Sequence, residues 1–358
     1  MTRSFVPGLP IVVIVSCKLA GLMVRIVAES SFSMTAAASP EGIAEIIVAH
    51  SDLPPGVIIG GPLVRAKRIE SYTLFAILMI GSVAGLAWAV THRVGLVEWS
   101  LFALMYALTT IGIGLSVHRM LVHRSFRCSS VVKFFLCAIG QMACQGSLLK
   151  WVGNHRRHHL YADHVGDPHS PYVDGKGFAI TQKLKSWLHA QSGWIFDETM
   201  TDNNVYAKDM LADPMVMMFT RTRWFWYFLS MVGIPAVWGY AFGGANAMWG
   251  TILFSGFFRA YLVVVSSVAV GSVCHRIGYR RFNETKDEST NQLLMAIITF
   301  GEGLHNNHHR FPRDAYISHA WYELDLNGLI ILGLEKLGLV FDVVDASRVN
   351  SSIIDAER

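Results

Sequence analysis

Histidines gathered in short boxes are the residues of this chain most suited to chemistry. The boxes read His118-Arg-Met-Leu-Val-His123, His155-Arg-Arg-His158-His159 and His305-Asn-Asn-His308-His309, and a ninth histidine, His275, stands alone. Neutral imidazole is a good ligand for iron, copper, zinc and nickel. One box alone carries little information, but three boxes beside long apolar runs predict a metal centre.

The spacing inside the boxes predicts two metal ions rather than one. In a regular α-helix, residues three and four apart share a face, so His155 can act together with His158 or His159. His158 and His159 point about 100° apart and can serve two different ions. Five steps separate His118 from His123, a turn of about 140° and a rise of about 7.5 Å, so in a regular helix these imidazoles would bracket a pair of ions. Nine imidazoles exceed one coordination sphere, whereas two spheres of four or five accommodate them.

Iron is the metal that this donor set favours over the others. Structural zinc prefers four ligands, often cysteine thiolates. The chain has 5 cysteines without a CxxC pair, so neither a thiolate zinc site nor a disulfide framework is indicated. Iron accepts five or six nitrogen and oxygen ligands and leaves positions for dioxygen.

The elements that position the boxes are long apolar helices. The composition is 52% hydrophobic and only 16% charged, against about a quarter charged in an ordinary soluble domain. About 20 apolar residues make a helix that crosses the roughly 30 Å hydrocarbon core of a bilayer. We therefore predict an all-α integral membrane protein with four transmembrane helices, and the alternative is a large soluble protein with buried core helices. The predicted spans are 73–90, 97–117, 224–242 and 247–271.

The distribution of Lys and Arg predicts the orientation of these spans. The segment Val117–Arg223 carries 13 of them, whereas the links Thr91–Leu96 and Gly243–Asn246 carry one and none. By the positive-inside rule, the histidine boxes face the cytoplasm in a helical cap. The net charge of +4 does not by itself indicate nucleic acid. The predicted domains are an N-terminal extension (1–68), poorly ordered, a membrane domain (69–344) with the cap at 118–223 and 272–344, and a C-terminal tail (345–358).

The boxes and their surroundings resemble the integral-membrane fatty acyl desaturases, in particular the stearoyl-CoA (delta-9) desaturase-like class and its bacterial members. The resemblance covers roughly Ile69 to Val344. The matching segments are HRMLVHRSF (118–126), QGSLLKWVGNHRRHHLYADHVGDPHSP (145–171), GW (193–194), SVCHRIGYRRF (272–282) and FGEGLHNNHHRFP (300–312).

The resemblance implies an oxygen-dependent desaturase that inserts a cis double bond, with delta-9 regiochemistry, into a saturated acyl chain during unsaturated fatty acid biosynthesis. It implies two iron ions, O2 as co-substrate, and an acyl tunnel that runs from the cap into the membrane. The implied substrate is an acyl-CoA, acyl-lipid or acyl-ACP, and the implied electron donor is a separate ferredoxin, rubredoxin or cytochrome b5 type protein. The implied location is the bacterial inner membrane, with the active site on the cytoplasmic side. The implied metal ligands are His118, His123, His155, His158, His159, His275, His305, His308 and His309.

Two positions depart from the family pattern. Gly271 stands where family members have an asparagine that helps to complete one iron sphere through water. Gly153 and Asn154 stand where many animal members carry an Arg-Asp pair associated with the acyl-CoA head group. After the first departure, a water or another side chain substitutes for the asparagine, or the site is altered. The second departure weakens the case for CoA as the acyl carrier.

Several side chains near the boxes have candidate roles. Asp163, Asp167 and Glu302 are expected to orient imidazole N–H groups from outside the metal spheres. His169 is expected to contact a ligand from outside the metal spheres or to be structural, rather than to bind metal itself. His164 and His189 are expected to be surface or satisfied polar residues. Arg259 falls inside the fourth span, where it contacts substrate or a buried acid unless the span boundary is shifted. The candidate tunnel residues are Phe102, Tyr106 and Trp151, the first two being equally well explained as lipid-facing or packing aromatics.

Two other functions are compatible with the same residues. A related membrane hydroxylase or oxygenase would share the ligands and the oxidant. A membrane metal transporter or sensor is a different class, and it would need ionisable ligands within the membrane. Here the histidines cluster at span ends and in the cap, which favours an enzyme.

Overall fold

The computed structural model divides the chain into two units, Met1–Pro55 and Gly56–Arg358. It describes residues 13–19, 22–28, 36–38, 44–46 and 53–346. The predicted extension (1–68) and tail (345–358) lie partly outside these residues. In the first unit, β1 (Val13–Leu19) pairs antiparallel with β2 (Leu22–Ala28), and β3 (Ala36–Ala38) pairs with β4 (Ala44–Ile46).

The first long helix begins earlier than the sequence predicts. Helix α1 (Gly61–Thr91) starts inside the segment assigned to the extension and twelve residues before the predicted span. A proline in its first turn is compatible with helix initiation. Charged residues in its first turns lower the local hydropathy, so the start of this helix is not recognised as part of an apolar span. Just before it, β5 (Val57–Ile59) pairs with β7 (Thr199–Thr201), which joins this end of α1 to the segment around residue 200.

Among the described residues, three helices are long and apolar enough to cross a membrane: Gly61–Thr91, Leu96–Val122 and Arg223–Cys274. The second joins α2 (Leu96–Ile111) to a π-helix, η1 (Gly112–Val122). The third joins α9 (Arg223–Phe228), the π-helix η3 (Leu229–Gly233), α10 (Ile234–Gly250), the π-helix η4 (Thr251–Phe258) and α11 (Arg259–Cys274).

The third helix is interrupted at Gly244. This residue has φ 74° and ψ −165°, a conformation open to glycine and outside the helical region. The predicted spans 224–242 and 247–271 lie on either side of it. The two halves pack on each other, and Thr251 Oγ1 donates a hydrogen bond to the Pro235 carbonyl oxygen at 2.7 Å.

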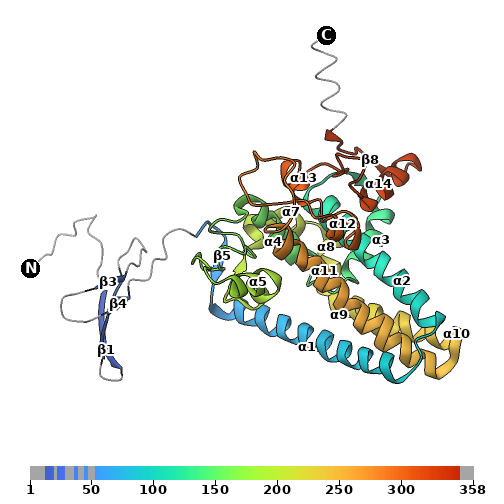
Figure 1. Cartoon of the computed structure of the whole chain (residues 1–358), viewed down its shortest axis with the longest axis horizontal. Helices are drawn as coiled ribbons and strands as arrows, with labels where there is room; N and C mark the ends of the chain where they lie inside the picture. The colour runs from blue at the N-terminus through green and yellow to red at the C-terminus, as the bar shows by residue number, and fades with distance from the viewer. Residues whose placement is uncertain (1–12, 20–21, 29–35, 39–43, 47–52, 347–358) are drawn as a thin grey trace, which may run out of the picture. The chain divides into compact units, whose positions relative to one another are not determined.

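Short elements complete the second unit around the histidine boxes (Figure 1). Ser147 caps the N-terminus of α4 (Leu148–Tyr161) by accepting a hydrogen bond from the Lys150 backbone N–H. The remaining elements are β6 (Arg127–Cys128), α3 (Ser130–Gln141), α4 (Leu148–Tyr161), α5 (Lys183–Gln191), the 3-10 helix η2 (Gly193–Phe196), α6 (Asn203–Tyr206), α7 (Lys208–Leu211), α8 (Pro214–Arg221), α12 (Leu293–Ile298), α13 (His305–Arg310), α14 (Leu326–Lys336) and β8 (Val340–Phe341).

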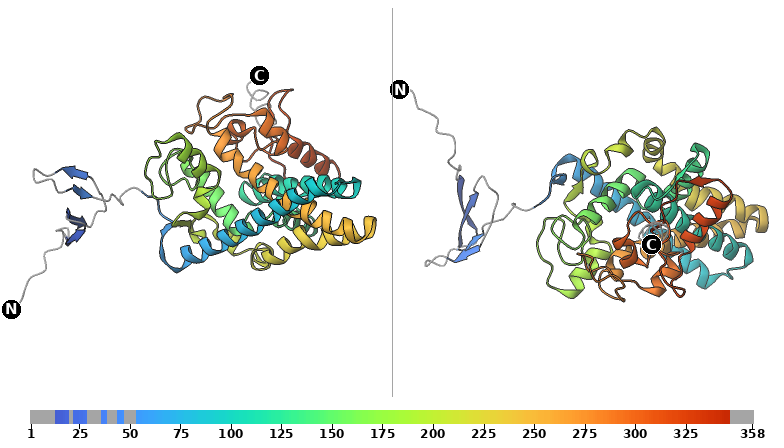
Figure 2. Two further views of the ribbon diagram at one scale, coloured as in Figure 1. Left: turned by 60° about the horizontal axis from the view of Figure 1, so that its bottom comes forward. Right: turned by 90° about the horizontal axis from the view of Figure 1, so that it is seen from above.

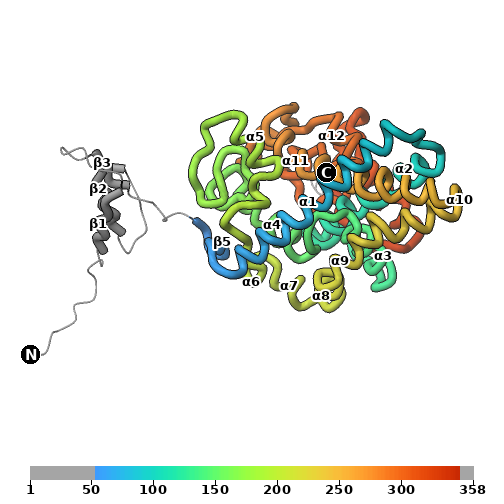
Figure 3. The backbone as a smooth tube through the Cα atoms, turned by 90° about the horizontal axis from the view of Figure 1, so that it is seen from below, coloured from blue at the N-terminus to red at the C-terminus, as the bar shows by residue number. Residues whose placement is uncertain are grey.

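The long helices extend from these short elements toward one end of the unit, where α10 lies (Figure 2). Helix α1 runs along one side of the unit from β5 to that end (Figure 3), and it packs against η4 and α11. The π-helix η1 packs against α3 and α4. The largest group of buried apolar side chains surrounds η1, α3, α4 and α8, and it holds the first two histidine boxes in place.

Candidate metal centre

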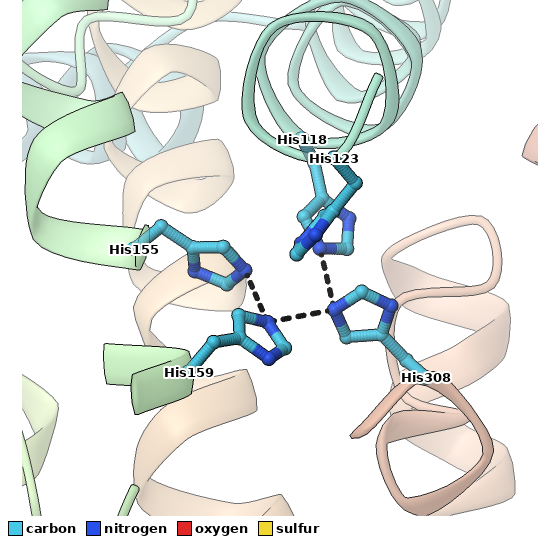
Figure 4. A group of neighbouring side chains, drawn as sticks. All are labelled: His118, His123, His155, His159 and His308. Atoms are coloured by element: carbon cyan, nitrogen blue, oxygen red, sulfur yellow. Dashed lines mark hydrogen bonds between the residues drawn. The ribbon is translucent and has the colours of Figure 1, made fainter. Parts of the chain in front are cut away.

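Five imidazoles meet in one group between η1, α4 and α13 (Figure 4). Each offers one ring nitrogen, and these nitrogens all lie within 4.8 Å of one another. The Nε2 atoms are 2.9 Å apart for His118 and His308, 2.9 Å for His308 and His159, and 3.0 Å for His159 and His155. We call this the five-histidine group: His118, His123, His155, His159 and His308.

The π-helix brings His118 and His123 into the same group. The His123 backbone N–H bonds to the His118 carbonyl oxygen at 3.1 Å, a step of five residues that defines a π-helical turn. The extra residue per turn places positions five apart on one face. The prediction that these two imidazoles bracket a pair of ions was therefore wrong, because it assumed a regular α-helix.

Four further imidazoles form a second group beside the first. The Nε2 atoms are 3.3 Å apart for His158 and His309, 3.1 Å for His309 and His305, and 3.0 Å for His305 and His275. His158 and His159 thus belong to different groups, as their directions on a helix predict. We call this the four-histidine group: His158, His275, His305 and His309.

Carboxylates contact the Nδ1 atoms of four of the imidazoles, whose Nε2 atoms point into the two groups. Asp167 contacts the Nδ1 atom of His158 at 3.0 Å, and Asp163 contacts that of His275 at 2.7 Å. Glu302 contacts the Nδ1 atom of His118. These three contacts confirm the orienting roles predicted from the sequence. Such contacts fix the ring direction and leave Nε2 free to bind a metal.

The fourth carboxylate, Asp287, was missed by sequence reasoning. It contacts the Nδ1 atom of His309 at 3.0 Å from a loop after α11. No spacing signal connects Asp287 to a histidine box, because it lies 22 residues from His309. Its loop is also tied to the centre by Asp163, which accepts a hydrogen bond from the Glu288 backbone N–H at 2.8 Å.

Burial keeps most of these imidazoles in the form that binds metal. Burial and neighbouring imidazoles hold the pKa of His155, His159 and His308 well below its usual value. Burial also lowers the pKa of His275, but Asp163 outweighs this effect and the net pKa is raised. Burial would raise the pKa of Glu302, but His118 and Arg119 lower it to about 2. The site therefore combines imidazoles whose pKa is lowered by burial with a Glu302 carboxylate whose pKa is lowered by its cationic neighbours.

The donor set fits a pair of transition-metal ions. Both groups consist of imidazole nitrogens alone, which suit iron, copper, zinc and nickel. The Nε2 atom of His123 is buried without a hydrogen-bond partner and belongs to the five-histidine group. An unpaired buried nitrogen is costly unless a ligand satisfies it.

The remaining histidines named from the sequence lie outside the two groups. His169 stacks on His158 with ring centroids 4.2 Å apart and forms a small set with His158 and Asp167. A Cβ atom on Gly271 would lie 3.3 Å from His169 Nδ1, so His169 packs beside the position where the resemblance implies an asparagine. His164 Nδ1 contacts the Ala162 carbonyl oxygen at 2.7 Å, and His189 is buried with Nδ1 3.9 Å from Asp197.

A cavity with mainly apolar walls reaches both histidine groups. Its wall includes His118 and His155 of the five-histidine group and His158 and His305 of the four-histidine group. From there it follows α1 through its apolar residues as far as Leu78. We call this space the acyl cavity, after the acyl tunnel that the sequence resemblance implies.

One of the three candidate tunnel residues lines the acyl cavity. Trp151 lies in its wall, and its Nε1 donates a hydrogen bond to Gln145 at 3.1 Å. Phe102 and Tyr106 do not line it. Phe102 packs against Phe254 with ring centroids 5.1 Å apart, and Tyr106 donates a hydrogen bond to the Ile298 carbonyl oxygen. These two residues are therefore packing aromatics, the alternative that the sequence left open.

Arg259 also lies outside the acyl cavity. It is fully buried and donates to the Ser255 carbonyl oxygen at 3.1 Å and to the Ser230 carbonyl oxygen at 3.0 Å. Within residues 53–346, no carboxylate forms an ion pair with it. Both carbonyl groups belong to π-helical segments, where the usual hydrogen-bond ladder is interrupted. Arg259 thus satisfies backbone groups of η3 and η4 rather than a substrate or a buried acid.

The fold and site define a helical protein in which two all-histidine groups border an apolar cavity. Comparison with known proteins gives this class a name. The sequence profile of the fatty acid desaturase family matches residues 96–331. The chain therefore belongs to the fatty acid desaturase family, whose members are oxidoreductases that introduce double bonds into fatty acyl chains.

Individual relatives agree with this assignment. The chain is 34% identical over 288 residues to a hex-5-enoyl-[acyl-carrier protein] acetylenase of Moorena producens, covering 80% of this chain and 89% of the relative. It is 34% identical over 243 residues to an sn-1 stearoyl-lipid 9-desaturase of Anabaena variabilis, covering 67% and 81%. It is 36% identical over 289 residues to an acyl-CoA C20 Delta5-desaturase of Anemone leveillei, covering 79% and 86%.

Proposed function

We propose that the five- and four-histidine groups each hold one iron ion, and that this pair performs the desaturation. The nine imidazoles are the ligands, and the four carboxylates behind them fix their orientation. When bound, the two irons supply the oxidising power that takes two hydrogens from an unactivated chain while O2 is reduced to water.

The chain's own residues place the substrate and keep water away. The acyl cavity is bordered by imidazoles of both groups, so an acyl chain lying in it passes directly beside the metal-binding nitrogens. Leu74, Phe75 and Leu78 of α1 give this space an apolar wall that favours a hydrocarbon chain over water. This shared border between cavity and both groups is the observation that carries the proposal.

The substrate that we propose is a saturated acyl chain, converted to its cis-Δ9 product. The Anabaena variabilis relative and an sn-2 palmitoyl-lipid 9-desaturase of Nostoc support this position. The acyl carrier is a lipid, CoA or acyl carrier protein, since relatives with each of these carriers are found. A separate protein, of ferredoxin, rubredoxin or cytochrome b5 type, supplies the electrons.

The membrane arrangement that we propose has four spans. The interruption at Gly244 and the packing of α10 against η4 support two antiparallel spans within Arg223–Cys274, in addition to α1 and α2 with η1. The distribution of Lys and Arg supports a helical cap with the metal centre on the cytoplasmic side. In a bacterium, this membrane is the inner membrane.

Expression of the chain in a host that lacks its own desaturase tests the function. Mass spectrometry of the extracted fatty acids should show the loss of two hydrogens, and derivatisation should place the double bond at carbon 9. An added oxygen atom instead would identify a hydroxylase with the same ligands. Unchanged fatty acids, with iron bound and electron donor supplied, would contradict both.

A further inference from the structure

The two histidine groups are held in place by different means. In the four-histidine group, His158, His275 and His309 each contact a carboxylate through Nδ1. In the five-histidine group, within residues 53–346, only His118 has such a contact. The other four imidazoles of that group are directed mainly by the elements that carry them. Its geometry therefore depends on how η1 and α4, which carry most of its members, are placed relative to each other.

Arg156 joins the end of η1 to α4. Its Nη2 donates a hydrogen bond to the Leu121 carbonyl oxygen at 2.8 Å, and its Nε donates to the Val122 carbonyl oxygen at 3.2 Å. Both carbonyl groups belong to the last two residues of η1, and the last carbonyl groups of a helix have no partner within it. Arg156 directly follows His155, and Val122 directly precedes His123. These hydrogen bonds therefore connect two members of the five-histidine group that come from different elements.

The guanidinium of Arg156 is itself held by α6 and α7. Its Nη1 and Nη2 donate to the two carboxylate oxygens of Asp209 at 2.6 Å and 3.0 Å, and Nη1 also donates to the Tyr206 carbonyl oxygen at 3.3 Å. Together with the two bonds to η1, these contacts use all five N–H donors of the side chain. Burial would raise the pKa of Asp209, but hydrogen bonds from Arg156 and Arg124 lower it below its usual value. A bidentate pair with an ionised carboxylate is strong and directional, so Asp209 fixes the orientation of Arg156.

We propose that Arg156 is a positioning residue that holds η1 and α4 in the arrangement in which the five-histidine group binds its iron. Because all its donors bind oxygen atoms, Arg156 acts through the backbone of η1 and not on an imidazole. The four-histidine group contains no residue of η1, so this role is confined to one of the two groups. This inference rests on the proposed function, since it takes each group to hold one iron.

The test measures iron binding by the purified full-length protein, separately from turnover. In Arg156→Gln, we expect the iron affinity of the five-histidine group to fall about 10- to 100-fold, as is typical when a residue that orients metal ligands is lost. Under a competing chelator, the iron content per polypeptide should then fall by about half. Mössbauer spectroscopy should show that the signal of one iron is lost and that of the other is kept. Asp287→Asn, which removes the carboxylate behind His309 of the four-histidine group, should weaken the opposite signal.

Matched variants separate the hydrogen bonds to η1 from a general effect of charge. Arg124 also pairs with Asp209, at 2.5 Å, but among the described residues its side chain donates to no carbonyl group of η1. Arg124→Gln should therefore keep both irons. Arg156→Lys keeps the charge but has fewer donors, and it should recover part of the affinity.

The partner of the guanidinium provides a second route to the same contacts. Asp209→Asn weakens the hold on Arg156 and should reduce the same iron signal as Arg156→Gln. Combining the two changes should add little to the loss in Arg156→Gln alone, because both act on one set of hydrogen bonds. If Arg156→Gln is absent from the membrane fraction, Arg156→Lys and Asp209→Asn decide, and full retention of both irons in these two variants would overturn the proposal.

The outcomes separate this inference from the proposed function. Unchanged iron affinity in Arg156→Gln, or an equal loss of both iron signals, would overturn the positioning role even if the original protein desaturates acyl chains. Loss of one signal in Arg156→Gln, with the other signal reduced in Asp287→Asn, would support it even if no desaturation is found. An original protein that binds a single iron or none would reject the proposed function itself, and this inference with it.

Discussion

His123 donates its backbone N–H to the carbonyl oxygen of His118, five residues earlier in the chain. This bond closes the last turn of a π-helix, and it allows two imidazoles at a spacing unsuited to an α-helix to reach one group. π-Helical turns are uncommon and concentrate at functional sites. Here the irregular turn is the reason that the first box contributes two side chains to the same group.

Removing one imidazole should disable the centre without removing the protein from the membrane. We expect His158→Ala to lose iron and to abolish turnover, since His158 belongs to the four-histidine group and borders the acyl cavity. Iron per polypeptide and fatty-acid profiles measure the two effects. His164→Ala, outside both groups, should keep iron and activity; full activity in His158→Ala would contradict the ligand assignment.

The carboxylate behind His309 should matter although it touches no metal. We expect Asp287→Asn to weaken iron binding or activity about 10- to 100-fold, because the amide cannot hold the imidazole as the carboxylate does. Iron titration with a competing chelator measures the affinity. Glu284→Gln is the matched control, since Glu284 lies three residues away and, among the described residues, forms an ion pair only with Arg310 at the surface. An equal effect of both changes would show that the loop, rather than the contact, is important.

A bulkier residue at the far end of the acyl cavity should shorten the preferred substrate. Leu78→Phe adds volume where the cavity wall along α1 ends. We expect kcat/KM for the longest accepted chain to fall about tenfold or more, since overpacking costs about 1–3 kcal/mol, while shorter chains are spared. Competition between acyl donors of different length measures the shift. Phe102→Leu, outside the cavity, should leave the length preference unchanged, and a shift there would mean that the cavity is not the acyl site.

Gly114 should be required for the position of Glu302. A Cβ atom at this π-helical position would collide with the Asn327 side chain and lie 2.9 Å from Glu302 Oε1. Since Asn327 donates a hydrogen bond to Glu302 and Glu302 contacts His118, Gly114→Ala should destabilise the protein by about 1–3 kcal/mol and lower its iron content. Thermal unfolding and iron analysis measure both effects.

Two variants test whether the collision at Gly114 is the cause. Asn327→Ala added to Gly114→Ala makes room, and should restore part of the stability. Gly333→Ala in α14 meets no atom within 4 Å and should be neutral or slightly stabilising. No rescue by the double change would contradict the steric explanation.

The sequence revealed the histidines but not the geometry that assembles them. All nine imidazoles of the two groups were identified from the boxes and the lone histidine, since imidazoles at short spacings are unusual outside metal sites. The carboxylates within or beside the boxes were identified by their proximity. The π-helical turn was missed because spacing was converted to direction with α-helical geometry, and Asp287 because its contact is made by a distant loop.

The candidate tunnel residues show a second limit of prediction from the sequence, which concerns the direction in which a side chain points. Phe102 and Tyr106 lie on a helix that is apolar on every side, so the sequence does not tell which side faces a cavity, a neighbouring helix or lipid. Only the packing of α2 against η4 and α11 decides this. Trp151, on the more polar helix α4, lies one helical turn before His155 and lines the acyl cavity.

His118 and His308 lie 190 residues apart in the chain and meet in one group, and α13 contributes to both groups. During synthesis, neither group is complete until α13 has left the ribosome and packed against η1 and α4. Metal loading is consequently expected to follow the synthesis of α13. Polypeptides truncated before residue 305 are expected to insert their long helices into the membrane without assembling the metal centre.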